Sequence, residues 1–276
     1  MANTQAAERN QSFPSLIQAV WVLMGLFGIE YMAATVFVAS GHRFSSGDPK
    51  VEGVIQVISF GILFSLLMAY KNLGYRQLFI PAFRLNAKVF MLLLIPILIV
   101  IMGLTILVSN LDSIVIHYYP MSPHEIQVFT HVLNGGFISV ITLVGIAPFL
   151  EEMLFRGIFL RSFLHRYSPL RSVLFSAALF GLAHLNIYQL AGAVVLGAFS
   201  GWLYVTTRSL WPSILIHSSF NAVGVLGALL SPDASNLSSE IAYDPWWVIG
   251  LAVLAITIGL FFVSKITKNL KEEGSG

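Results

Sequence analysis

The sequence predicts an all-α, polytopic membrane protein with about eight transmembrane helices and a polar active site inside the membrane. Hydrophobic residues make up 57% of the 276 residues and charged residues only 10%, whereas soluble domains carry about 25% charged residues. The mean hydropathy is +0.81. Apolar runs long enough to cross a bilayer recur along the chain and leave no room for a separate soluble domain.

The apolar runs define the elements in order. We predict eight spans: Ser15–Ser40, Val54–Tyr70, Val89–Val108, Gly136–Leu160, Ser172–Ile187, Leu190–Val205, Pro212–Leu230 and Pro245–Ser264. The short fifth and sixth runs are also compatible with one re-entrant hairpin, and two spans is the simpler interpretation. The predicted organisation is a cytoplasmic segment 1–13, a single transmembrane domain 14–264 and a cytoplasmic tail 265–276.

The positive charges predict the orientation of these spans. With the N-terminus inside, thirteen of the fifteen Lys and Arg residues fall on the inner side, and only Arg43 and Lys50 fall outside. Cytoplasmic loops of membrane proteins carry this excess of positive charge. The polar first residues do not form a secretory signal peptide. We therefore expect both termini to be cytoplasmic.

Composition also excludes several function classes. The net charge of +2 is too small to indicate a nucleic-acid partner. The chain has no cysteine, which excludes disulfides, thiolate metal sites and a cysteine nucleophile. Its expected surroundings are the lipid bilayer. The basic and aromatic segment Leu73–Lys88 is interpreted either as a headgroup-layer helix or as a charged tether.

Three charged residues lie inside the fourth span. Charges at such depth cost a few kcal/mol each, so they are rare and are functional by default. Glu152 and Arg156 are four residues apart and share one helix face, where they can form an ion pair. Glu151 points about 100° away from Glu152 and has no local counter-ion. Glu151 is therefore the candidate general acid or base.

Further polar residues occur in two other spans. His184 follows Phe180 by four residues in the fifth span, and Asn221 follows His217 by four in the seventh. The backbone groups of these helices are already hydrogen-bonded to one another, so the buried polar side chains must form hydrogen bonds with one another or bind a ligand. At about 1.5 Å per residue, their depths overlap near the middle of the membrane. One shared site is geometrically allowed.

These residue types suit hydrolysis of a peptide bond. A glutamate and a histidine can polarise one water for attack on a carbonyl, and a second histidine with an asparagine can stabilise the oxyanion. His, His and Glu also form a normal zinc set, so a zinc-dependent reaction stays open. The sequence contains no H-E-x-x-H motif.

In this order, the motifs Glu151-Glu152…Arg156, Phe180…His184 and His217…Asn221 resemble the CPBP (Abi) family of CAAX prenyl endopeptidases and bacteriocin-processing or self-immunity proteins. The similar region covers about 135–230, a core of one eight-helix domain. The resemblance implies that Glu151 and His184 hold the water and that His217 and Asn221 stabilise the oxyanion. It implies mainly architectural roles for Glu152, Arg156 and Phe180, although the family usually requires both glutamates for catalysis.

The resemblance implies an intramembrane endopeptidase without a cofactor, with zinc as the alternative. Its substrates would be membrane-associated: prenylated C-terminal peptides, or leader and signalling peptides. Short loops and the lack of organelle signals favour a prokaryotic plasma membrane. A non-catalytic adaptor or immunity protein is a second interpretation. A transporter is a third, although the chain shows no two matching halves.

Overall fold

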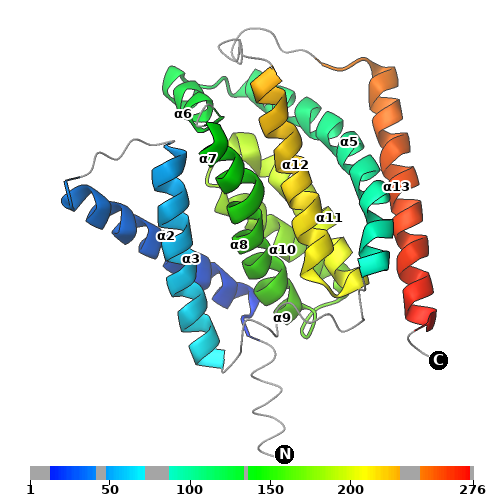
Figure 1. Ribbon diagram of the computed structural model, residues 1–276, viewed down its shortest axis with the longest axis horizontal. Helices are drawn as coiled ribbons and strands as arrows, with labels where there is room; N and C mark the ends of the chain where they lie inside the picture. Colours follow the sequence, from blue (N-terminus) through cyan, green and yellow to red (C-terminus); the bar gives the residue numbers. More distant parts are fainter. Residues whose placement is uncertain (1–12, 42–47, 72–86, 134–135, 231–242, 274–276) are drawn as a thin grey trace, which may run out of the picture.

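The computed structural model describes residues 13–41, 48–71, 87–133, 136–230 and 243–273, and the regular structure in these ranges is helical (Figure 1). Three stretches lie outside the described residues: the predicted segment 1–13 (except Phe13), most of Leu73–Lys88, and residues 231–242 between the last two predicted spans. The separate helices are α2 (Leu16–Ala39), α3 (Pro49–Lys71), α5 (Ala87–Tyr118), α6 (Pro123–Leu133), α10 (Pro169–Ala183), α11 (Ile187–Thr207), α12 (Leu210–Leu230) and α13 (Trp246–Glu273).

A longer composite helix runs from Gly136 to Phe163. It consists of α7 (Gly136–Val140), the π-helical stretch η1 (Ile141–Ile146), α8 (Ala147–Glu152), a second π-helical stretch η2 (Met153–Leu160), and α9 (Arg161–Phe163). Both adjacent glutamates lie in α8, between the two π-helical stretches. Such stretches occur often at functional sites, because the extra residue per turn changes which side chains share a face.

The prediction of an all-α, polytopic membrane protein is confirmed. Each of the eight predicted spans corresponds to a helix, and six of the described helices are long and apolar enough to cross a membrane. α10 is apolar but only 15 residues long. α12 is 21 residues long and carries the polar residues His217 and Asn221. Helices suit this environment because their backbone groups are bonded within the segment.

Several boundaries differ from the prediction by a few residues or more. The third span was expected to end at Val108, but α5 continues to Tyr118. The polar residues beyond Val108 do not stop it, because Asn110 Nδ2 donates 2.8 Å hydrogen bonds to the Ile106 carbonyl one turn back and to Asp244 Oδ2. The fifth span begins earlier, at Pro169, which suits the first helical turn because its ring nitrogen has no hydrogen. α13 continues to Glu273, through most of the predicted tail.

Figure 1 shows how the helices surround the composite helix. α2 crosses α3 on one side of it, and α5 and α13 pack side by side on the other. α12 contacts α8, η1 and η2 and lies between these two groups. The glutamates of α8 are therefore placed in the interior of the bundle rather than against lipid.

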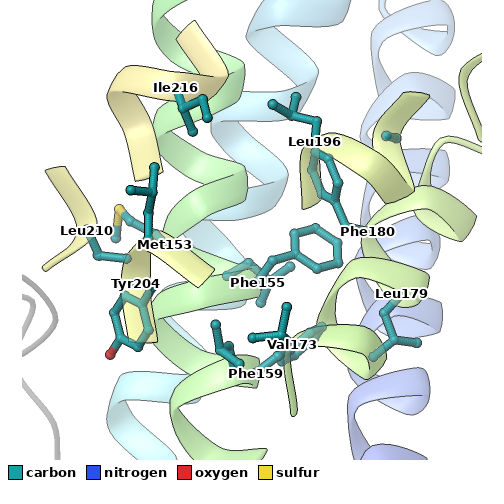
Figure 2. Close-up of a cluster of buried hydrophobic side chains, with 14 of the residues drawn as sticks. Met153, Phe155, Phe159, Val173, Leu179, Phe180, Leu196, Tyr204, Leu210 and Ile216 are labelled. Carbon is teal, nitrogen blue, oxygen red and sulfur yellow. The ribbon is translucent and has the colours of Figure 1, made fainter. Parts of the chain in front are cut away.

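A cluster of buried apolar side chains joins η2, α10, α11 and α12 (Figure 2). Phe155 of η2 and Phe180 of α10 meet edge to face with ring centroids 5.1 Å apart, an arrangement favoured by the charge distribution of aromatic rings. Gly197 of α11 lets α10 approach closely: a Cβ there would lie 3.1 Å from Ala177 Cα and 3.2 Å from the Phe180 ring. This close contact fixes the position of the Phe180 ring.

We expect Gly197→Val to destabilise the fold by about 2 kcal/mol, because added side-chain atoms force apart well-packed helices. The measurement is the thermal unfolding midpoint of the detergent-solubilised protein. Gly61→Val in α3 is the matched control, since a Cβ at Gly61 has no atom within 4 Å. Equal midpoints for both variants would contradict a packing role for Gly197.

Candidate active site

Glu152 is the most densely bonded polar side chain of the site. Its side chain is fully buried. Oε1 accepts from Arg156 Nη1 at 2.8 Å and faces His217 Nδ1 at 2.9 Å, and Oε2 accepts from Ser200 Oγ at 2.6 Å. The predicted pairing of Glu152 with Arg156 is therefore present. Because a carboxylate only accepts hydrogen bonds, the Nδ1 atom of His217 carries the proton in this contact.

Arg156 is buried as completely as Glu152. Its Nη2 donates to the Gly197 carbonyl at 3.0 Å, and its guanidinium carbon lies 4.7 Å from the centroid of the Phe180 ring. A buried charge is tolerated only when it is paired and hydrogen-bonded. Arg156 meets this requirement through the carboxylate of Glu152, a backbone carbonyl and the face of an aromatic ring.

Glu151 has a different environment from its neighbour. Its side chain is 19% exposed. Oε1 receives a 3.4 Å hydrogen bond from Gln56 Nε2 of α3, and Oε2 lies 3.8 Å from His217 Nε2. These distances are longer than those around Glu152. The His217 ring therefore lies between the two glutamates, with Nδ1 toward Glu152 and Nε2 toward Glu151.

His184 occupies the turn between α10 and α11. It is the residue that caps α10, and its Nδ1 lies 2.9 Å from the Phe180 carbonyl oxygen. A carbonyl only accepts, so Nδ1 carries a proton, and in the neutral ring Nε2 then keeps its lone pair. The next residue, Leu185, has a positive φ of 52°, a conformation uncommon outside glycine. The chain thus turns sharply at the histidine.

Phe180 connects these groups to the apolar core. Its ring centroid lies 5.1 Å from the His184 ring and 5.3 Å from the His217 ring, with both pairs edge to face. The same ring contacts Phe155 and Arg156 of η2. One aromatic side chain thereby sets the distance between the two histidines.

Asn221 bonds to a carbonyl that the composite helix leaves free. In η1 the Ala147 N–H bonds to the Thr142 carbonyl, so the Leu143 carbonyl would next be served by residue 148. That residue is Pro148, which has no backbone N–H. Asn221 Nδ2 of α12 donates to the Leu143 carbonyl instead, at 2.8 Å. The π-helical register and the proline together explain the position of Asn221.

A cavity of about 760 Å³ contains the remaining functional side chains. Glu151, His184, His217 and Asn221 all line it, so the structure brings these four predicted residues to one space. Glu152 and Arg156 lie behind the wall, buried in the bundle. Within the described part of the chain, no three His, Cys, Asp or Glu residues are grouped closely enough to hold a metal ion.

Several residues of the site were missed by the sequence analysis. Glu30 of α2, Gln56 of α3 and Asp112 of α5 line the cavity. Glu30 is a carboxylate in an apolar run, the signal that identified Glu151, and it could have been found in the same way. Asp112 was missed because the third span was ended at Val108. Ser200 gives no such signal, since small hydroxyl residues are common where membrane helices pack.

A family model described as type II CAAX prenyl endopeptidase Rce1-like matches residues 132–223. All five candidate catalytic residues lie in this stretch: Glu151, Glu152, His184, His217 and Asn221. Searches of the curated proteins and of the solved structures found no match.

The fold and the cavity define a class of protein, a helical membrane protein with a carboxylate–histidine site inside the bundle. The family match then specifies it further. The model that matches residues 132–223 describes CAAX-type endopeptidases, which supports the resemblance carried by the motifs.

We expect Arg156→Met to destabilise the protein by about 3 kcal/mol, because it leaves the carboxylate of Glu152 buried without its counter-ion. The thermal unfolding midpoint in detergent measures this loss. Arg171→Met is the control, because Arg171 is exposed near the start of α10. A midpoint for Arg156→Met equal to that of the control would contradict the structural role of the ion pair.

Proposed function

We propose that the protein is an intramembrane endopeptidase that hydrolyses a peptide bond with water activated by Glu151 and His184. The family match supports a CAAX-type protease. The single observation that carries the assignment of residues is the contrast between the two glutamates. Glu152 is buried and fully bonded, whereas Glu151 is partly exposed on the cavity wall beside the free Nε2 side of His217.

In the proposed first step, a water binds between the carboxylate of Glu151 and the Nε2 atom of His184. Nε2 is available as an acceptor because Nδ1 bonds to the Phe180 carbonyl. Glu151 takes one proton from the water as the water oxygen attacks the peptide carbonyl carbon. When the C–N bond breaks, Glu151 returns this proton to the leaving nitrogen. The products are a carboxyl group and an amine, and no covalent intermediate with the enzyme forms.

The oxyanion of the tetrahedral intermediate needs hydrogen-bond donors that are already in place. Asn221 uses one amide hydrogen for the Leu143 carbonyl and retains the second. His217 is held through Nδ1 by Glu152, so its Nε2 side is oriented toward the cavity. With both ring nitrogens protonated, His217 is the second donor. The group formed by Glu151, Glu152, Arg156 and this form of His217 carries no net charge.

The proposed mechanism uses no metal. An asparagine amide is a suitable donor for an oxyanion, whereas zinc prefers imidazole, thiolate and carboxylate ligands. In this mechanism Asn221 therefore has a function that a zinc site would not need.

The proposed substrate is a membrane-associated peptide or protein. Both a prenylated C-terminus and a leader or signalling peptide agree with a cavity inside a helical bundle, and the family description favours the former. The proposed location is the plasma membrane of a prokaryote, with both termini in the cytoplasm. Cleavage of matched peptides with and without a prenyl group separates the two kinds of substrate.

We expect Glu151→Gln and His184→Ala each to lower the cleavage rate by at least about a hundredfold, because each removes a group that activates the water. The measurement is hydrolysis of a membrane peptide substrate by the purified protein in liposomes. Glu125→Gln and His165→Ala, two changes outside the cavity, are the matched controls. Full activity of both Glu151→Gln and His184→Ala would show that the proposal is wrong.

Two further results would replace parts of this proposal. Stoichiometric zinc, with activity lost to a chelator and restored by zinc, would establish the metal-dependent reaction. A cellular phenotype that survives in the uncleaving Glu151→Gln protein would instead indicate an adaptor or immunity protein that acts by binding.

The orientation predicts a labelling pattern. The chain has no cysteine, so single cysteines can be introduced without removing others. We expect Ser235→Cys to react with a membrane-impermeant maleimide in intact cells. Thr4→Cys and Ser275→Cys should react only after the membrane is permeabilised. The reverse labelling pattern would show that the protein has the opposite orientation in the membrane.

A further inference from the structure

We propose that Gln56 of α3 is a positioning residue for Glu151: its side-chain amide donates a hydrogen bond that orients the carboxylate toward the water. This inference rests on the proposed function, and it assigns a role to a helix outside the region matched by the family model. The residue touches neither the water nor the peptide in this mechanism, so its effect on the reaction passes through Glu151.

The geometry around Glu151 supports this role. Gln56 Nε2 lies 3.4 Å from Oε1, and His217 Nε2 lies 3.8 Å from Oε2. Each carboxylate oxygen is thus approached by a nitrogen from a different helix, α3 for Oε1 and α12 for Oε2. Because a carboxylate only accepts, the amide nitrogen of Gln56 and not its oxygen must face Oε1. These two contacts restrain the rotation of the carboxylate.

The chemical type of Gln56 also suits a base that must stay available. A lysine or arginine at this position would form an ion pair with Glu151, as Arg156 does with Glu152. Such a pair would hold the proton-accepting group too tightly for it to exchange a proton in each cycle. A neutral amide orients the carboxylate and leaves its negative charge in place.

The packing of α3 brings Gln56 within reach of Glu151. Gly53 is three residues earlier and lies on the same side of the helix. A Cβ at Gly53 would lie 2.8 Å from Thr142 Oγ1 of η1, which is too close for a normal contact. The glycine therefore allows α3 to approach the composite helix at the level of the cavity, and Gln56 extends across this interface.

The test compares two variants of nearly equal size. Gln56→Met keeps the length of the side chain and removes the donor. Gln56→Glu keeps its shape and replaces the donor with a second carboxylate. We expect Gln56→Met to lower kcat by about fivefold to tenfold with KM within about twofold, since one hydrogen bond to a charged group is lost. We expect Gln56→Glu to lower kcat at least as much, since a second carboxylate beside Glu151 competes with it for the proton. Gln127→Met, an exposed change on α6 outside the cavity, should leave both constants unchanged.

The controls separate this inference from the proposed function. Thermal midpoints of the full-length variants in detergent establish that each is folded, and Gln56→Glu remains informative if Gln56→Met is not. An unchanged kcat for a folded Gln56 variant would overturn the positioning role, as would a raised KM with unchanged kcat. If the folded Gln56 variants keep their kcat and Glu151→Gln is inactive in the same assay, only the proposed role of Gln56 is wrong. If Glu151→Gln retains full activity, the proposed function fails with it.

Discussion

The arrangement of the site depends on the contacts that the carboxylate of Glu152 makes with its neighbours. This carboxylate is fully buried and accepts hydrogen bonds from Arg156 of η2, Ser200 of α11 and His217 of α12. In a membrane interior an unpaired carboxylate would cost several kcal/mol, so each of these donors is needed where it is. Three helical segments are thereby held at fixed distances around one buried group, and His217 receives its orientation from the same bond.

This constraint gives the two adjacent glutamates different properties. Glu152 uses its bonding capacity inside the bundle, and Glu151, one residue earlier on the helix, faces the cavity with two long contacts. The π-helical stretches on either side of α8 are part of this arrangement. η1, together with Pro148, leaves the Leu143 carbonyl to Asn221. In a regular α-helix that carbonyl would accept from the Ala147 N–H, whereas here its partner is the side chain of Asn221.

Features that depend on composition, or on the spacing of residues within one helix, could be predicted from the sequence. Hydropathy predicted the spans, and the spacing of four residues predicted the pair of Glu152 with Arg156. The contact of His217 with both glutamates could not be predicted, because it joins residues 65 positions apart through the packing of α12 on α8. Asp112 was missed for a different reason: its polar neighbour Asn110 bonds within the helix and to Asp244, so α5 continues where polarity indicated a loop.

The cavity is built from two parts of the chain. The stretch 132–223 matched by the family model supplies Glu151, His184, His217 and Asn221. The other wall comes from α2, α3 and α5, which contribute Glu30, Gln56 and Asp112. In the proposed mechanism the first set carries out the hydrolysis. The second set extends the cavity beyond these residues, and Gln56 connects the two sets through its hydrogen bond to Glu151.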